Sequence, residues 1–243
     1  MSTAAGMAPA RECVLLSYDE PRAERHHRRL IGVFGAVKRL HGVRGMGRAY
    51  RLCAELVDTE EFFLADADLA IDTSFDPGTV TPLPAGVPMR VWRTRNPVNG
   101  LVYGYGGLKL CRRSAFRHLG RVPSAVDVLA GLPGRPEFVP AVAGDTAFDA
   151  SPRHTWRAGF RECAMLTRGC DYRRVRSEEA EHRLHAWQHI GHGPFGAWAR
   201  QGAADGIAFA QWARDNSTVW ALLNDPQWLD EHFAQLGHAV PGG

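Results

Sequence analysis

The chain has 243 residues, of which 45% are hydrophobic and 23% charged, a composition typical of a soluble globular domain. No apolar run reaches the roughly 20 residues that a membrane-spanning helix needs, and a net charge of +3 is too weak to indicate a nucleic-acid partner. The five cysteines include no C-x-x-C pair, which argues against a disulfide framework and a zinc site. We expect a cytoplasmic protein with a disordered tail over residues 1–10 and a single domain over 11–243.

The first half of the chain alternates apolar runs with amphipathic segments. A buried strand is expected over 13–18, followed by a helix over 22–35 whose Arg/His cluster, residues 25–29, faces outward. A second helix is expected over 49–57, where apolar residues recur with helical spacing, and a buried strand over 62–65. The order strand, helix, helix, strand predicts an α/β fold with a parallel sheet.

The second half begins with a loop rich in Pro and Gly over 76–88 and then returns to strands. Strands are expected over 89–95, 108–111 and 138–142, with turns at Asn96-Pro97 and Asn99-Gly100. A helix is expected over 155–167, and residues 177–238 have helical patterns, including Asp225 as N-cap before Pro226. We therefore expect a mixed, mostly parallel sheet flanked by helices, with a helical C-terminal extension.

An acidic motif, Asp66-Ala67-Asp68, directly follows the apolar strand at 62–65. Ligands of open α/β folds bind at the carboxyl ends of the strands, so both carboxylates are expected at a ligand site. Two such oxygen ligands suit Mg²⁺ or Mn²⁺, which share their coordination shell with substrate phosphates and stabilise a leaving diphosphate. The motif favours a metal-dependent glycosyltransferase; for an isolated Asp-x-Asp, a pair of solvated loop carboxylates is the alternative.

Residues near the first strand are candidates for contacts with the nucleotide-sugar donor. Tyr18 would flank the base and Asp19 would bond the base or ribose, unless this acidic turn only caps the helix that follows. Lys38 and Arg44, in a Gly-rich connection before the second helix, are candidates for the donor diphosphate. The alternative for both cations is a solvated basic loop.

The segment Tyr103-Gly104-Tyr105-Gly106-Gly107-Leu108-Lys109 combines flat side chains with glycines that permit close backbone approach. Tyr105, Gly106, Gly107 and Lys109 are therefore candidate donor contacts, and a tight hairpin with packed tyrosines is the alternative. Lys109 is one of only two lysines in an arginine-rich chain, which hints at a need for a compact ammonium.

The helix at 155–167 supplies further candidates. Trp156 and Arg157 are expected near the donor, and Glu162 is a candidate general base, or else half of a structural ion pair. Asp145, with Asp149, is the rival for the role of base. His192, in a His-Gly-rich turn that also contains His189, is a candidate third metal ligand; a surface role is the alternative.

Six motifs taken together resemble those of the TET/JBP-associated glycosyltransferases, the phage and bacterial relatives of the base J glucosyltransferase. The resemblance covers roughly residues 13–200 and is carried, in order, by Ser17-Tyr18-Asp19-Glu20-Pro21, His41-Gly42-Val43-Arg44-Gly45, Asp66-Ala67-Asp68, Arg95-Asn96-Pro97-Val98-Asn99-Gly100, Tyr103-Gly104-Tyr105-Gly106-Gly107-Leu108-Lys109-Leu110 and Thr155-Trp156-Arg157-Ala158-Gly159-Phe160-Arg161-Glu162.

The resemblance implies a GT-A fold, a divalent metal held through Asp66 and Asp68, and a nucleotide-sugar donor such as UDP-glucose. It also implies a hydroxymethylated pyrimidine in DNA as acceptor. Candidate phosphate contacts are then the arginines of the central segment, Arg90, Arg93, Arg95, Arg112, Arg113 and Arg117.

Three alternatives stay open. The acceptor could be a protein or a small molecule, or the chain could be a non-catalytic nucleotide- or DNA-binding module. A nucleotidyltransferase is disfavoured, because Asp19-Glu20-Pro21 stands where such enzymes carry a Gly-rich phosphate loop.

Overall fold

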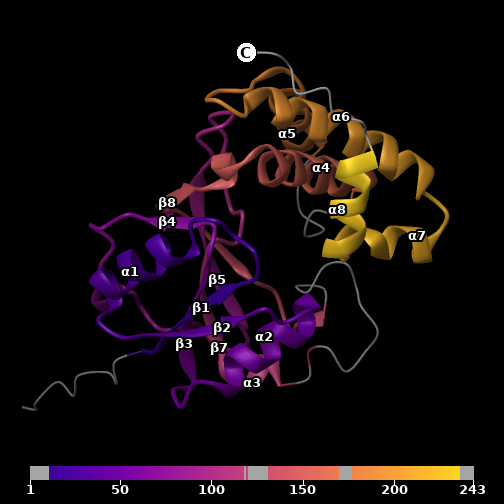
Figure 1. The fold of residues 1–243 in the computed structure, drawn as a ribbon. Helices are drawn as coiled ribbons and strands as arrows, with labels where there is room; N and C mark the ends of the chain where they lie inside the picture. Colours follow the sequence, from indigo (N-terminus) through magenta and orange to yellow (C-terminus); the bar gives the residue numbers. More distant parts are fainter. Residues whose placement is uncertain (1–10, 118, 120–130, 170–176, 236–243) are drawn as a thin grey trace, which may run out of the picture.

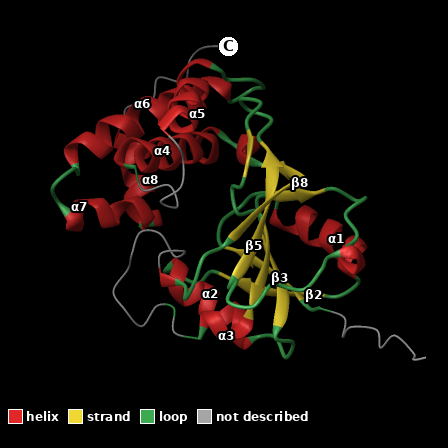
Figure 2. Ribbon diagram, turned by 180° about the vertical axis from the view of Figure 1, so that it is seen from behind, coloured by secondary structure: helices red, strands yellow, loops and turns green. Residues whose placement is uncertain are grey.

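A computed structural model describes residues 11–117, 119, 131–169 and 177–235. The tail expected over residues 1–10 lies outside these ranges. The architecture is an eight-stranded mixed sheet with helices on both faces and a helical layer at one end (Figures 1 and 2). Within the described ranges, no helix combines the length and apolar character that a bilayer crossing requires.

The first half of the chain contains β1 (Cys13–Ser17), α1 (Ala23–Phe34), β2 (Val37–His41), α2 (Met46–Glu55), β3 (Glu61–Asp66) and β4 (Leu69–Ile71). The expected order was wrong in one respect, because β2 lies between the two helices. This strand pairs only with β1, at the edge of the sheet, and none of its residues is buried. An edge strand without a buried face lacks the apolar run by which a strand is found in a sequence.

The second half continues the sheet and then becomes helical. Its strands are β5 (Met89–Arg95), β6 (Val102–Tyr103), β7 (Leu108–Arg112) and β8 (Glu137–Thr146), with the short helix α3 (Arg113–Phe116) after β7. The helical part comprises α4 (Pro152–Arg168), α5 (Ser177–His189), α6 (Gly196–Trp212), α7 (Ser217–Ala221) and α8 (Pro226–Gln235). The 3₁₀ turns are η1 (Pro77–Thr79), η3 (Phe148–Ala150) and η4 (Leu222–Asn224).

The strands lie in the order β2-β1-β3-β7-β5-β8-β4, and β6 pairs with β5. β1 is parallel to β2 and β3, and β5 is parallel to β8, whereas β7 runs antiparallel between β3 and β5. Along this path only β7 and β4 oppose the common direction, so the expected mixed, mostly parallel sheet is confirmed. The carboxyl ends of β1 and β3 therefore share one edge.

The two faces of the sheet are buried by different helices. Alternate residues of β1 and β3 point to opposite faces: Leu15 and Phe63 meet Leu30 of α1, while Val14 and Phe62 share a cluster with Cys53 of α2. All of these side chains are nearly inaccessible to water, and burial of each large one contributes about 1.5–3 kcal/mol. These contacts fix α1 and α2 on either side of the strand ends that carry the acidic residues.

Helices α4 and α6 cross at close range. A Cβ added to Gly202 would lie 2.1 Å from the carbonyl oxygen of Trp156, and one added to Gly206 would lie 2.1 Å from that of Phe160. Glycine at both positions lets the two backbones touch, which no larger residue would permit. These contacts fix α4 against α6, and α4 lies beyond one end of the sheet (Figure 1).

Candidate functional site

The acidic motif forms a tight connection between β3 and β4. Asp66 is the last residue of β3, and its amide donates to the carbonyl of Gly107, 2.9 Å away. The amide of Ala67 donates to Leu16 at the end of β1, also at 2.9 Å. Because β1 and β3 are parallel, their ends bring the motif beside the turn that follows β1, as the sequence predicted.

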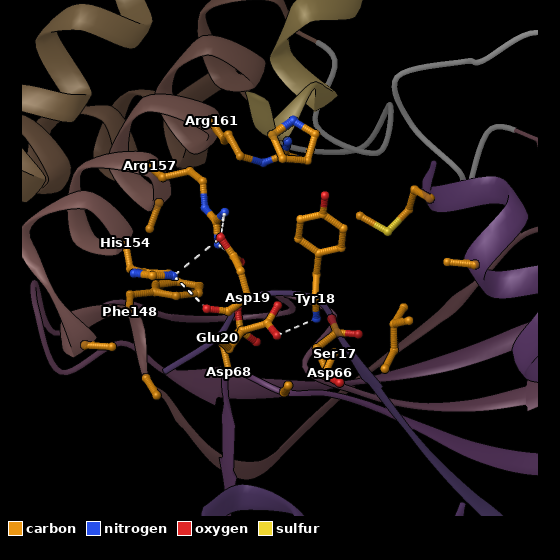
Figure 3. Close-up of a pocket in the computed structure, with 18 of the residues that line it drawn as sticks. Ser17, Tyr18, Asp19, Glu20, Asp66, Asp68, Phe148, His154, Arg157 and Arg161 are labelled. Atoms are coloured by element: carbon orange, nitrogen blue, oxygen red, sulfur yellow. Dashed lines mark hydrogen bonds and ion pairs between the residues drawn. The ribbon is translucent and has the colours of Figure 1, made fainter. Parts of the chain in front are cut away.

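A cavity of about 370 Å³ lies between this edge of the sheet and helices α4 and α8. Its floor is acidic, with Glu20, Asp66 and Asp68 close together, and Arg157 and His154 reach towards it from α4 (Figure 3). Eight of the predicted site residues line this cavity: Tyr18, Asp19, Arg44, Asp66, Asp68, Tyr105, Arg157 and Glu162.

Asp66 has a protein cation as its partner. The Nζ of Lys109, on β7, donates to Asp66 Oδ1 at 2.8 Å, and the lysine side chain is only 3% exposed. Burial raises the pKa of Asp66, and the nearby ammonium acts in the opposite direction. Gly106 and Gly107 do not line the cavity; Gly107 supplies the carbonyl that holds Asp66, and a Cβ on Gly106 would lie 3.5 Å from the Lys109 side chain.

Asp68 has no such partner in the described part of the chain, where no donor bonds its carboxylate. Burial, together with the negative charges of Asp66 and Glu20, raises its pKa to about 7. A half-buried carboxylate beside two others is the chemistry that a divalent oxygen-loving cation stabilises. Among the described residues, no three His, Cys, Asp or Glu side chains are arranged to hold a metal ion by themselves. An ion bound here would therefore take further ligands from water or substrate.

The turn after β1 carries Asp19, whose carboxylate, unlike that of Asp68, is bonded by cationic side chains. Arg157 donates from Nη1 and Nη2 to both carboxylate oxygens of Asp19, each at 3.0 Å, and Arg153 Nη2 adds a bond of 2.7 Å. His154 Nε2 lies 3.7 Å from the same carboxylate. Burial alone would raise the pKa of Asp19, but these partners hold it below its usual range. Arg153 also pairs with Asp230, so this network joins the β1 turn to α4 and α8.

Tyr18 occupies the α2 side of the cavity. Its amide donates to Glu20 Oε2 at 2.7 Å, which orients both residues, and Arg44 Nε lies 3.3 Å from its hydroxyl. Arg44 is exposed and borders the cavity. Lys38 does not: it lies on β2, where its Nζ pairs with Glu12 at 2.6 Å and donates to the carbonyl of Leu56.

At the opposite side, Tyr105 lines the cavity and its ring packs closely, in a tilted arrangement, against that of the buried Tyr103, with ring centroids 3.6 Å apart. The hydroxyl of Tyr103 donates to Glu162, and the guanidinium of Arg183 lies 3.7 Å from both the Tyr103 ring centroid and Glu162 Oε1. Glu162 thus reaches the cavity from α4, with Tyr103 and Arg183 beside its carboxylate.

The remaining predicted site residues lie elsewhere. Asp145, on β8, is bonded at 2.5 Å to Arg95, which also pairs with Asp72, and it does not line the cavity. His192 is exposed in the turn between α5 and α6, where its amide donates to Val98. Trp156 is fully buried and donates to Asp205. The structure therefore does not bring these three residues to the acidic floor.

The arginines expected to contact DNA phosphate are mostly engaged with the protein. Arg90 and Arg112 donate to main-chain carbonyls of the loop before β5. Arg95 and Arg113 pair with carboxylates, whereas Arg93 and Arg117 are exposed.

Two contributors to the site were missed in the sequence. No role was predicted for Glu20, although it lies beside Asp68. His26 was expected to face outward with its neighbours but is only 3% exposed, and burial lowers its pKa. Its position between Ala23 and Leu30, both buried at helical spacing, was the available signal.

No protein-family model matches the chain, and no curated protein matches it. A solved structure of a mannosyltransferase from Pyrobaculum calidifontis, in complex with GDP-Man and Mn²⁺, is similar over 95% of this chain and 82% of its own. The identity is 14% and the TM-score 0.41, so this likeness leaves the activity and ligands of the present chain open.

Proposed function

We propose that this protein is a metal-dependent glycosyltransferase that takes a sugar from a nucleotide-sugar donor. The observation that carries the proposal is Asp68, a cavity-facing carboxylate next to Asp66 that has no cationic partner among the described residues. Its place at the carboxyl edge of the sheet is where open α/β folds bind ligands. The six motifs shared with the TET/JBP-associated glycosyltransferases support the same activity.

In this proposal the acidic floor of the cavity and Arg157, which reaches towards the floor from α4, have complementary roles. Asp66 and Asp68 would hold Mn²⁺ or Mg²⁺, which would supply charge neutralisation for the departing diphosphate. Asp19 occupies two of the five N–H groups of Arg157 and so fixes the guanidinium above the floor. The remaining N–H groups would bind a phosphate oxygen of the donor, and Arg44, which also lines the cavity, would offer a second contact.

The donor and the acceptor would occupy opposite sides of the acidic floor. Tyr18 offers its ring to the nucleoside of the donor, for which UDP-glucose is our first candidate from the resemblance. A cavity of about 370 Å³ is within the usual range for small-molecule sites. On the other side, the carboxylate of Glu162, held by Tyr103 and Arg183, is our candidate to accept the proton of an acceptor hydroxyl.

For the acceptor we propose a hydroxymethylated pyrimidine in DNA, which the same motifs imply. Such a base must leave the duplex stack to enter a cavity of this kind. A protein or small-molecule acceptor would use the same donor chemistry and is separated from DNA by the experiment below.

The test is release of UDP from a panel of UDP-sugars with Mn²⁺, with and without hydroxymethylpyrimidine DNA. Wild type is compared with Asp68→Ala and with Asp145→Ala, a matched carboxylate outside the cavity. We expect metal-dependent release that DNA stimulates, that Asp68→Ala abolishes and that Asp145→Ala retains. Release without stimulation would move the acceptor to another class. Failure of every donor to bind or react would leave a binding module in place of the enzyme.

A further inference from the structure

The main chain of the acidic motif is held at four points by four different parts of the fold. The amide of Asp66 donates to Gly107, and the amide of Ala67 donates to Leu16. The carbonyl of Asp68 accepts from the amide of Ala147 at 2.6 Å. The fourth contact differs in kind, because the carbonyl of Ala67 is held by a side chain, that of His26.

His26 is the fourth residue of α1, 41 residues before Ala67. Its Nδ1 is 2.6 Å from the Ala67 oxygen, and the side chain is almost completely buried. A carbonyl oxygen can only accept, so Nδ1 carries the proton and donates it to Ala67. Because Ala23 and Leu30 bury α1 against the sheet, the ring has a fixed position relative to β3.

The carbonyl of Ala67 belongs to the peptide that connects Ala67 to Asp68, and the Ala67 amide belongs to the peptide from Asp66. Fixing both groups fixes the two planar peptides, and with them the directions in which the side chains of Asp66 and Asp68 leave the chain. We propose that His26 is a positioning residue that holds Asp66 and Asp68 in the relative orientation required to bind a divalent cation together.

The identity of the cation rests on the proposed function. The hydrogen bond from His26 to Ala67, on which the positioning role is based, does not depend on that function. A neutral imidazole suits the role, because it donates a hydrogen bond without adding a positive charge that would compete with a metal for the carboxylates. Lys109 differs in this respect, since its ammonium occupies an oxygen of Asp66 directly. Indirect ligand-orienting contacts of this kind typically change metal affinity by about 10- to 100-fold.

Three substitutions separate the hydrogen bond from the packing. The amide nitrogen of Asn lies near the position of Nδ1, so His26→Asn can still donate to Ala67. The amide of Gln lies nearer the position of Nε2, and Phe fills the space without donating. His27→Phe is the matched control, because the neighbouring His27 also contacts a carbonyl, that of Val37 at 3.2 Å, but away from the cavity.

Two measurements on the full chain decide the question. Mn²⁺ binding is measured by electron paramagnetic resonance in the presence of UDP, and hydrogen exchange is followed at the amides of residues 66–68. We expect His26→Phe to bind Mn²⁺ about 10- to 100-fold more weakly and to exchange faster at these amides. His26→Gln should resemble His26→Phe, whereas His26→Asn and His27→Phe should stay within about threefold of wild type in both measurements.

Equal behaviour of His26→Phe and wild type would overturn the inference. So would equal impairment of His26→Asn and His26→Phe, since the ring would then act by packing alone. A wild-type protein that binds no Mn²⁺ would overturn the proposed function instead. The exchange rates at residues 66–68 would still decide whether His26 fixes the motif.

Discussion

The two acidic turns at the carboxyl edge of the sheet have opposite electrostatic surroundings. Asp19 is bonded by Arg153 and Arg157 and approached by His154, and its pKa lies below the usual range. Asp68 lines the same cavity without an ion-pair partner in the described chain, and its pKa is raised. A carboxylate that the protein has already neutralised connects elements of the fold, whereas one left with excess negative charge is suited to a ligand cation.

The strongest test of this contrast is Asp68→Asn. We expect the loss of about 10³-fold in turnover, since stabilisation of a leaving group by a metal is worth several kcal/mol. The unfolding temperature should stay the same or rise, because the substitution removes a charge repelled by its neighbours. Turnover comes from UDP release and stability from thermal unfolding without divalent ions. A large loss of stability would mean that Asp68 is a structural residue like Asp19.

The next test concerns Lys109, the cation that the fold supplies to Asp66. Lys109→Met leaves a mostly buried carboxylate without its partner, and we expect a loss of about 2–4 kcal/mol in the free energy of unfolding. Mn²⁺ should restore part of this loss by neutralising Asp66. Urea unfolding with and without Mn²⁺ measures both effects, and the double variant Lys109→Met with Asp66→Asn should be less destabilised than Lys109→Met alone.

Asp19→Asn tests the other side of the comparison. The change leaves Arg153 and Arg157 with weaker acceptors, and we expect a loss of about 1–3 kcal/mol in stability. Turnover should fall as well, because Arg157 loses the contact that fixes it above the floor. Mn²⁺ affinity measured by titration should change little. A large drop in metal affinity with intact stability would mean that Asp19 belongs to the metal site, and Asp19 and Asp68 would then no longer differ in role.

The pH dependence of stability should differ between the two turns. The pKa of Asp68 is about 7 in the folded chain against an ordinary value of 3.8, so between these values the folded state binds the extra proton. Stability of the metal-free protein due to this group therefore falls as pH rises from about 4 to about 7. Asp19 has a lowered pKa, so its contribution is complete above about 3.8 and constant from pH 5 to 8.

Thermal unfolding of wild type and Asp68→Asn across pH 5–8, without divalent ions, isolates the contribution of Asp68 to the pH dependence of stability. The stability gained by Asp68→Asn relative to wild type should grow with pH over this window. Mn²⁺ binding should also strengthen with pH, since protons compete for Asp68. A difference between the two proteins that does not change with pH would show that Asp68 is ionised throughout.

The sequence predicted those parts of the site that depend on strand ends. Asp66, Asp68, Tyr18 and Asp19 follow apolar runs directly, and parallel strands bring such ends together whatever the details of packing. Asp145 could not be placed in this way. Its environment depends on the register of β8 against β4 and β5, which local pattern does not determine, and that register places it beside Arg95.

The long-range contacts of the helices could not be predicted from the sequence either. His26 belongs to a run of Arg and His that favours an exposed face, and only the packing of α1 on the sheet shows that this member is buried. Trp156 was predicted near the donor together with Arg157, yet successive residues of a helix point about 100° apart. Trp156 therefore enters the core between α4 and α6, while Arg157 faces the cavity.

The smallest expected effect comes from Lys38, which the sequence placed with Arg44 as a contact for the donor diphosphate. Lys38, on the edge strand β2, forms an exposed ion pair with Glu12, so Lys38→Ala should change stability little and leave turnover within about twofold. Arg44→Ala should raise the KM for the donor several-fold and change stability less, because Arg44 borders the cavity and contacts Tyr18. Steady-state kinetics on both variants separates a charge at the cavity from one distant from it. If Lys38→Ala raised the donor KM as much as Arg44→Ala, the diphosphate would have to reach the β2 edge. The acidic cavity, which Lys38 does not line, would then not be the site of the diphosphate.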